Sequence, residues 1–351
     1  MDYLKYVEDI EDRIDPETED RLYADWVKFA DGGWHEDFFA PHRPVKPSSI
    51  SDWPKININD ALNDYDLMLV NQLSICNMIL HYGSGRLLFA RSNYGVGILP
   101  SLYGVKPFLM PYESDTLPSV YPVKGGIYGI KTIIESGIPN LDSGYSKKVF
   151  EFGERLLNIQ AKYPKIGKYL RIDHPDIQGP MDVCEMLWGS EIFYAIYDNA
   201  SLLHKLLRNV TDSYIAFLRK WFELCPKTDN YHAYFGSLHK GSLTLRDDSA
   251  MNLSPGMFAE FISPYDGKIY ETFGGGAMHY CGKGDHFIDL ASNIKNLTAV
   301  NLSQPYLNDM ETIFENTVEK GINIISLGKD AVKQAVERER PLRGLVSVDD
   351  F

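Results

Sequence analysis

The sequence has few cysteines and no long apolar run. Four cysteines in 351 residues argue against a disulfide framework and favour free thiols or metal ligation. No stretch approaches the ~20 consecutive apolar residues that a membrane-spanning helix needs. The opening residues MDYLKYVEDIEDR are acidic, whereas a signal peptide is basic and then apolar. We therefore expect a cytoplasmic protein that does not enter a membrane.

Positive charge is also scarce. The chain has 35 Lys and Arg against 48 Asp and Glu, which gives a formal net charge of -13. Residues 1–40 carry 13 acidic and 4 basic side chains, so most of the imbalance is local. No run of Lys or Arg reverses this field elsewhere. Because such a protein repels a phosphate backbone, we expect no nucleic-acid partner.

Glycine-rich phosphate-binding motifs are missing as well. No GxGxxG follows a predicted strand. The pair Gly282-Lys283 lacks the earlier Gly and the following Ser or Thr of a P-loop. An open nucleotide-binding sheet is therefore disfavoured.

The chain does contain a repeated pattern of strand and then helix. Short apolar runs bounded by Gly, Pro, Asp or Asn predict the strands. The longest predicted helix covers Ser201 to Leu224, and another begins with Ser254 as N-cap followed by Pro255. The predicted strands are 87–91, 169–173, 232–235, 243–247, 277–281, 297–302 and 322–327, with an eighth near Phe108.

This pattern predicts an α/β fold with a parallel sheet covered by helices. The strand count and the length favour a (β/α)8 TIM barrel over residues 61–351. Residues 1–60 are acidic and rich in aromatic side chains, which a free tail would leave unburied. We expect them to form a helical extension packed on the barrel, as a roof over its mouth or as part of a homodimer surface.

His279 and Cys281 are the sharpest chemical feature. On a strand their side chains point to the same face with Cα atoms about 7 Å apart, so both can reach one metal ion. A catalytic zinc site needs a third protein ligand from another strand end. The alternative is a pair of packed polar side chains.

Other predicted strand ends supply further polar groups. Asp247 and Asp248 follow one strand, and at most one of them faces a site because adjacent side chains alternate. His239, in a loop, is a candidate ligand or general base. The candidate substrate-binding residues lie at two other strand ends and are Arg91, Asn93, Tyr94, Asp176 and Gln178. Arg91 matches the planar fork of a carboxylate, but each group has a purely structural alternative as a turn or ion pair.

Several of these segments resemble the uroporphyrinogen decarboxylase superfamily over roughly residues 60 to 330. The resemblance lies in the segments Asp176-Ile177-Gln178-Gly179-Pro180, Leu187-Trp188-Gly189-Ser190-Glu191, Tyr197-Asp198-Asn199, Asp247-Asp248-Ser249-Ala250 and His279-Tyr280-Cys281-Gly282. It implies a (β/α)8 barrel, in agreement with the strand pattern. The His-x-Cys-Gly segment is similar to the methyltransferase branch, which moves a methyl group between a corrinoid protein and a thiol such as coenzyme M.

In that branch the resemblance implies zinc at His279 and Cys281, with a third Cys near the last strand. Here residues 325–329 contain no Cys, so Asp247, Asp248 or His239 are the candidate substitutes. The chain has no Asp-x-His-x-x-Gly run, so the corrinoid is expected on a partner protein, with a small thiol as the other substrate.

Two other functions stay open. Uroporphyrinogen III decarboxylase needs an Arg-rich N-terminal motif and an Asp on an early strand, and the sequence shows Arg91-Ser92-Asn93 instead. A barrel that binds a tetrapyrrole or a corrinoid protein without catalysis is the remaining alternative.

Overall fold

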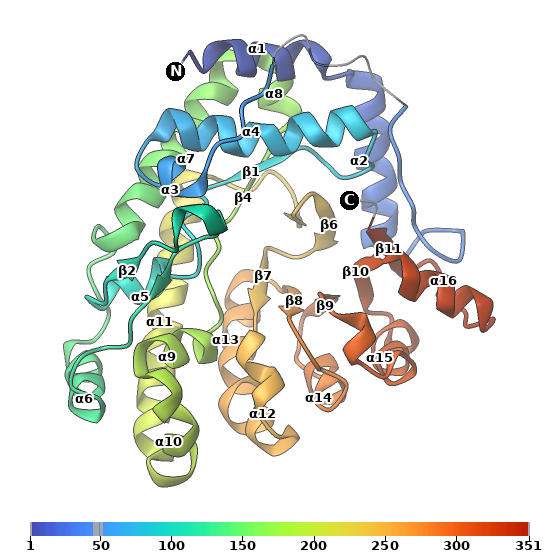
Figure 1. Cartoon of the computed structure of the whole chain (residues 1–351). Coiled ribbons are helices and arrows are strands. Elements are labelled where there is room, and N and C mark those ends of the chain that lie inside the picture. Colours follow the sequence, from blue (N-terminus) through green and yellow to red (C-terminus); the bar gives the residue numbers. More distant parts are fainter. Residues whose placement is uncertain (1, 45–48, 50–51, 350–351) are drawn as a thin grey trace.

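The computed structural model describes residues 2–44, 49 and 52–349 and has an α/β fold (Figure 1). Its strands are β1 (Phe89–Arg91), β2 (Pro107–Phe108), β3 (Ser119–Val120), β4 (Arg171–Asp173), β5 (Tyr231–Tyr234), β6 (Ser237–Lys240), β7 (Leu243–Arg246), β8 (Gly276–Tyr280), β9 (Leu297–Leu302), β10 (Asn323–Gly328) and β11 (Val346–Asp349). Its helices are α1 (Leu4–Arg13), α2 (Pro16–Ala30), α3 (Ile58–Ala61), α4 (Tyr65–Tyr82), α5 (Ile98–Leu102), α6 (Ile127–Ser136), α7 (Gly144–Lys162), α8 (Pro164–Tyr169), α9 (Pro180–Trp188), α10 (Ile192–Asp198), α11 (Ala200–Leu224), α12 (Pro255–Phe261), α13 (Ser263–Phe273), α14 (Ile288–Ser292), α15 (Met310–Asn316) and α16 (Lys329–Glu337).

A five-stranded parallel sheet organises the C-terminal half of the chain. Its strand order is β11-β10-β9-β8-β7. The strands are buried along most of their length, which explains why the sequence shows them as short apolar runs. Helices α12 and α13 follow β7, α14 follows β8, α15 follows β9 and α16 follows β10 (Figure 1). Because the strands are parallel, their carboxyl ends meet at one edge, where α/β folds place their ligands.

Strands β1 and β4 form a second parallel pair, with Phe89 opposite Arg171. Between residues 52 and 349, no ladder joins this pair to the five-stranded sheet. The predicted parallel sheet is therefore confirmed, whereas its closure into a (β/α)8 barrel stays a prediction.

Two predicted strands lie in antiparallel hairpins instead of a parallel sheet. The segment near Phe108 is β2, which pairs with β3. The segment 232–235 lies mostly in β5, which pairs with β6. Phe235 and Gly236 join these two strands with φ angles of 48° and 80°, and two successive positive φ angles produce a tight two-residue hairpin turn. The prediction of parallel strands at these two places is wrong, because each segment pairs antiparallel with the next strand along the chain.

The N-terminal segment contains helices α1 and α2, and its aromatic side chains pack against the sheet. Trp26, Phe29 and Phe39 are buried in one cluster with Ala277 and Ile325 from the sheet. The backbone N–H of Phe39 also donates to the carbonyl of Val346 at 2.8 Å. This packing explains how the acidic segment buries its aromatic side chains. The division of the chain at residue 60 stays a prediction.

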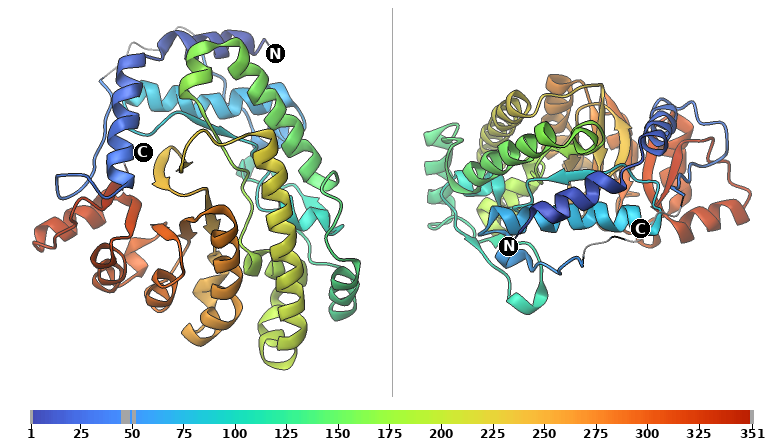
Figure 2. Two further views of the ribbon diagram at one scale, coloured as in Figure 1. Left: turned by 180° about the vertical axis from the view of Figure 1, so that it is seen from behind. Right: turned by 90° about the horizontal axis from the view of Figure 1, so that it is seen from above.

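The two helices predicted with most detail are present. The segment predicted from Ser201 to Leu224 is α11, which runs beside α7 (Figure 2). The rings of Phe150 on α7 and Trp221 on α11 are in contact. Ser254 caps α12 through its hydroxyl, which accepts from the N–H of Met257 at 3.3 Å. Among the described residues, no helix has the length and apolar character required to cross a membrane.

Candidate metal centre

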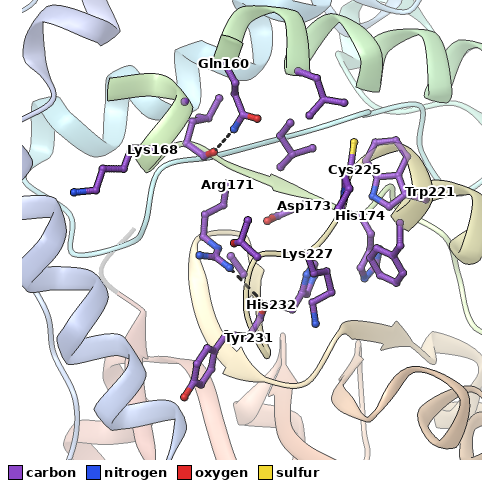
Figure 3. A pocket seen from close by; sticks show the side chains of 18 residues that line it. Gln160, Lys168, Arg171, Asp173, His174, Trp221, Cys225, Lys227, Tyr231 and His232 are labelled. Carbon is purple, nitrogen blue, oxygen red and sulfur yellow. Dashed lines mark hydrogen bonds between the residues drawn. The ribbon is translucent and has the colours of Figure 1, made fainter. Parts of the chain in front are cut away.

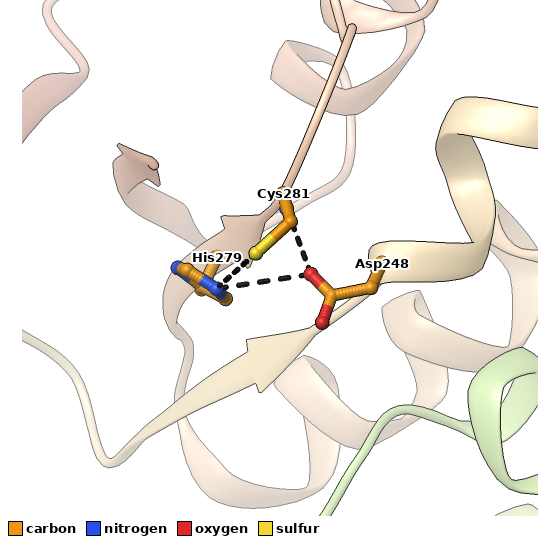
Figure 4. Close-up of side chains that lie close together, drawn as sticks. All are labelled: Asp248, His279 and Cys281. Atoms are coloured by element: carbon orange, nitrogen blue, oxygen red, sulfur yellow. Dashed lines mark hydrogen bonds and ion pairs between the residues drawn. The ribbon is translucent and has the colours of Figure 1, made fainter. Parts of the chain in front are cut away.

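The carboxyl ends of β7 and β8 bring three potential metal ligands together. In the ladder between these strands, Arg246 lies opposite His279. Asp248 follows β7 by two residues, and Cys281 follows β8 directly. Side chains alternate along an extended chain, so His279 and Cys281 share a face, as the sequence predicts. The ligand atoms of Asp248, His279 and Cys281 all lie within 4.8 Å of one another (Figure 4).

The separations within this triad are short. The Sγ atom of Cys281 lies 3.6 Å from Nε2 of His279, and that nitrogen lies 3.7 Å from Oδ1 of Asp248. The same carboxylate oxygen accepts from the backbone N–H of Cys281 at 2.7 Å. The carboxylate is therefore positioned by the backbone of the ligand strand itself. Sulfur, imidazole nitrogen and carboxylate oxygen are the three donor types that zinc accepts in proteins.

Asn301 fixes the orientation of the His279 ring. The Nδ1–H of His279 donates to Oδ1 of Asn301 at 2.6 Å, and the amide of Asn301 donates to the carbonyl of Ile325 at 2.8 Å. With its proton on Nδ1, the ring turns the lone pair of Nε2 toward Asp248 and Cys281. Burial lowers the pKa of His279 below its ordinary value. The imidazole is thus held neutral, which is the form that binds a metal.

The Cys281 thiol and the Asp248 backbone are also constrained. Burial raises the pKa of the Cys281 thiol to about 11, so this thiol needs a cation nearby to ionise at neutral pH. Asp182, on α9, accepts from the N–H of Asp248 at 2.9 Å and from that of Ser249 at 2.8 Å. These hydrogen bonds stabilise the turn that places Asp248 next to His279 and Cys281.

Asp247 and His239 lie outside the triad. Asp247 is fully buried, and burial together with the nearby Asp266 carboxyl raises its pKa well above the ordinary value. His239 lies on β6, where Nε2 accepts from the Thr244 hydroxyl at 2.8 Å and Nδ1 donates to the carbonyl of Lys240 at 2.9 Å. Of the three candidate third ligands, only Asp248 approaches His279 and Cys281 within the described part of the chain.

A cavity of about 490 Å³ opens beside the triad. It is lined by Asp248, His279 and Asn301 together with two of the predicted substrate-binding residues, Asp176 and Gln178. This arrangement places candidate substrate-binding residues next to the candidate metal ligands.

An ion-pair cluster around Asp176 adjoins this cavity, and its members Asp176 and Arg246 line it. One carboxylate oxygen of Asp176 forms an ion pair with Nε of Arg246 at 2.9 Å. The other oxygen forms an ion pair with a guanidinium nitrogen of Arg91 at 3.3 Å. Arg91 also packs over the ring of Phe235 at 4.5 Å, and the side chain of Gln178 donates to Asp176 at 3.0 Å. Asp176 thus links Arg246, which lines the cavity, to Arg91, which is not among the described residues of its lining.

The remaining predicted substrate-binding residues do not line this cavity. Tyr94 is fully buried, and burial raises its pKa. Asn93 has a buried side-chain oxygen without a hydrogen-bond partner in the described structure. These two side chains contribute to the packing behind β1 rather than to the cavity.

A second cavity of about 180 Å³ lies near β4 and β5 (Figure 3). His174 and His232 stack there with ring centroids 4.5 Å apart. Burial lowers the pKa of Lys227 to about 8, and its ammonium donates to the carbonyl of Gly241 and the hydroxyl of Ser242. None of the predicted site residues is among the described residues that line this cavity. The chemistry predicted from the sequence therefore belongs to the larger cavity at the triad.

Asn301 and Arg246 are the site residues that the sequence analysis misses. Asn301 is a polar residue within the otherwise apolar run from Leu297 to Leu302, and that contrast is the signal that could identify it. Arg246 ends a predicted strand beside the two aspartates, but its partner Asp176 is 70 residues away in the sequence, so the pairing has no local signal.

Fold and site together define an α/β protein with a candidate metal centre at the carboxyl edge of its parallel sheet. No protein-family model matches the chain, and no curated protein matches it. A solved structure does match, that of a methyltransferase from Methanosarcina mazei. The two share 14% sequence identity with a TM-score of 0.63, over 93% of this chain and 91% of the other. At this identity the likeness establishes a shared fold.

Proposed function

We propose that this protein is a methyltransferase in which Asp248, His279 and Cys281 hold a zinc ion that binds an acceptor thiol. A corrinoid partner protein carries the methyl group in this proposal. The convergence of the three ligand atoms within 4.8 Å is the observation that carries it. The fold shared with the Methanosarcina mazei methyltransferase supports the same reaction class, as does the resemblance of the His-x-Cys-Gly segment to the methyltransferase branch of the uroporphyrinogen decarboxylase superfamily.

The geometry of the triad fits zinc. Bonds of ~2.0 Å to nitrogen, ~2.3 Å to sulfur and ~2.1 Å to oxygen in a tetrahedron place the ligand atoms ~3.4–3.6 Å apart. The separations of 3.6 Å between Cys281 and His279 and of 3.7 Å between His279 and Asp248 are close to these values. Three protein ligands leave one tetrahedral position for a substrate atom, as catalytic zinc sites require.

The third ligand in this proposal comes from the end of β7. In the methyltransferase branch that the sequence resembles, a Cys near the last strand has this role. Here Ser326 on β10 forms a 2.6 Å hydrogen bond with Ser237. In this proposal Asp248 supplies a carboxylate where that branch has a thiolate.

The protein residues supply positioning and a neutral imidazole. Bound zinc lowers the pKa of a coordinated thiol and holds it as the nucleophilic thiolate. Asn301 keeps Nε2 of His279 free of a proton, and Asp182 holds the turn that carries Asp248. The adjoining cavity of about 490 Å³ has room for the rest of a small thiol, with Arg246 in its wall.

A transfer assay tests the proposal. The zinc-loaded protein is incubated with methylcobalamin as the corrinoid donor and with a panel of small thiols, and methyl thioethers are measured by mass spectrometry. We expect turnover with at least one thiol and a loss of at least 100-fold in Cys281→Ala. His286→Ala is the matched control, because His286 is a nearby loop histidine that bonds the carbonyl of Leu253 instead of the triad.

The result that would overturn the proposal is equally specific. Zinc-loaded protein that methylates no thiol, yet converts uroporphyrinogen to coproporphyrinogen, would establish the decarboxylase alternative.

A further inference from the structure

The cavity beside the triad has a neighbour of about 440 Å³. We call the first the mixed lobe, because arginines and aspartates both line it, and the second the acidic lobe. Both lobes are lined by Val96, Gln178 and Asp248. They therefore meet at the candidate metal centre.

The acidic lobe has a one-sided charge. Asp182, Glu185 and Asp248 line it, and none of the described residues in its lining is Lys, Arg or His. Uncompensated carboxylates around a cavity favour a cation inside it. The mixed lobe, in contrast, has Arg86 and Arg246 beside its aspartates.

Two acceptor atoms in this lobe lack a donor. Glu185 uses one carboxylate oxygen to accept from the Ser249 hydroxyl at 2.6 Å. Gln178 is only 5% exposed and donates its amide N–H to Asp176. Within the described structure, no hydrogen-bond donor reaches the other oxygen of Glu185 or the amide oxygen of Gln178. Such acceptors are normally satisfied by a donor from protein, water or ligand.

The carboxylates of the lobe are too dispersed for a metal ion. Among the described residues, the triad is the only group of three acidic, His or Cys side chains whose ligand atoms converge. Asp182 already uses both oxygens on the backbone of Asp248 and Ser249. The opposite wall is apolar and consists of Val96, Val120, Pro122 and Met186. Acceptors on one side and aliphatic groups on the other suit an organic cation better than a metal.

We propose that the acidic lobe binds the alkylammonium group of a small molecule. Its N–H groups donate to Glu185 and Gln178, and its alkyl carbons contact the aliphatic wall. Charge-assisted hydrogen bonds of this kind are stronger than those between neutral groups. The inference goes beyond the proposed methyl transfer, and the two residues that bond the ammonium group, Glu185 and Gln178, lie outside the triad.

Calorimetric titration of the full chain with butylammonium, 1-butanol and butyrate tests the proposal. The three probes have the same alkyl chain and differ in charge. We expect butylammonium to bind at least tenfold more tightly than 1-butanol, and butyrate to bind most weakly. Equal affinities for butylammonium and 1-butanol would overturn the proposal.

Variants locate the binding. Glu185→Gln removes one charge with little change in shape and should weaken butylammonium binding about tenfold. Glu191→Gln makes the same change at an exposed residue outside the lobe and should leave it unaltered. Asn252→Lys places a cation at an exposed position of the lobe lining and should weaken binding at least tenfold even if Glu185→Gln folds poorly. Unchanged affinity in Asn252→Lys would contradict the assignment.

A chelator distinguishes butylammonium binding in the acidic lobe from zinc binding at the triad. Butylammonium should still bind after treatment with chelator, because neither Glu185 nor Gln178 belongs to the triad. A protein that binds butylammonium but no zinc would leave this inference standing and remove the proposed methyltransferase.

Discussion

Asn301 shows how a single hydrogen bond can prepare a metal ligand. Its side chain is the only described partner of His279 Nδ1, and it is itself anchored to the backbone of β10. Without this acceptor the imidazole can turn or carry its proton on Nε2. Partners of this kind typically contribute 10- to 100-fold to metal affinity.

Replacing Asn301 tests that role. We expect Asn301→Ala to weaken zinc binding 10- to 100-fold while the chain remains folded, since the truncated side chain lies at a cavity wall. Competition with a chromophoric chelator measures the affinity. Asn293→Ala, an exposed residue that bonds the carbonyl of Asp289, is the matched control. Equal zinc affinity in Asn301→Ala and wild type would contradict the positioning role.

The ionisation of Asp173 makes the stability of the folded protein depend on pH. Burial raises its pKa to about 8, although the nearby arginines oppose the shift. In the unfolded chain an Asp ionises near pH 4. Between these values the folded state binds the extra proton, so this contribution to stability is complete below pH ~4 and is lost as the pH rises through 8.

Asp173→Asn removes this contribution to the pH dependence of stability, because Asn cannot ionise. Relative to wild type, the variant should become more stable as the pH rises from 5 to 8, by at most about 1.4 kcal/mol per pH unit. Urea unfolding at each pH measures the difference. The same substitution at the exposed Asp142 should show no such trend. A difference between Asp173→Asn and wild type that is constant over this range would contradict the assignment.

At the scale of elements, a buried ion pair fastens α2 to the body of the protein. Glu19 on α2 pairs with Arg43 through two hydrogen bonds, and the guanidinium also reaches the carbonyls of Ser84 and Arg86 just before β1. Both side chains are almost fully buried. The aromatic cluster of Trp26, Phe29 and Phe39 is therefore supported by a polar attachment.

Breaking the ion pair between Glu19 and Arg43 should destabilise the folded protein. We expect Arg43→Met to lower the free energy of unfolding by ~3–5 kcal/mol, because it leaves the Glu19 carboxylate buried without its cation. Urea denaturation checks the value. Asp20→Asn disrupts the exposed neighbouring pair with Lys168 and should have little effect. Equal stabilities of Arg43→Met and Asp20→Asn would contradict this account.

Elements with local signals are the ones that the sequence predicts well. The Ser254-Pro255 start of α12 needs only neighbouring residues, and so does the apolar stripe of α11. The hairpin of β5 and β6 is missed because an apolar run reveals a strand but not the direction of its partner. Strand β11 is also missed, although Val346 and Val348 alternate with polar residues as strands often do.

At the scale of the whole molecule, the sequence predicts the class of fold but not its closure. Repeated strands and helices predict a parallel sheet, and the five-stranded sheet confirms it. Closure depends on pairing between strands far apart in the chain, such as β4 and β7, and no local pattern encodes that pairing.

The candidate site could likewise be predicted only in part from local sequence patterns. Alternation along one strand places His279 and Cys281 on one face, and this can be predicted. The choice of Asp248 over Asp247 or His239 depends on the register of β7 against β8 and on the turn held by Asp182. These are contacts between distant segments, so the sequence could only offer the three as alternatives.

The zinc content of protein purified without chelator tests the central claim most directly. Wild type and Asp247→Asn should each contain about one zinc per chain, because Asp247 lies outside the triad. Cys281→Ala and Asp248→Asn should contain less than a tenth of an equivalent. Wild-type protein without zinc, or zinc content that is unchanged in Cys281→Ala and Asp248→Asn, would contradict the account.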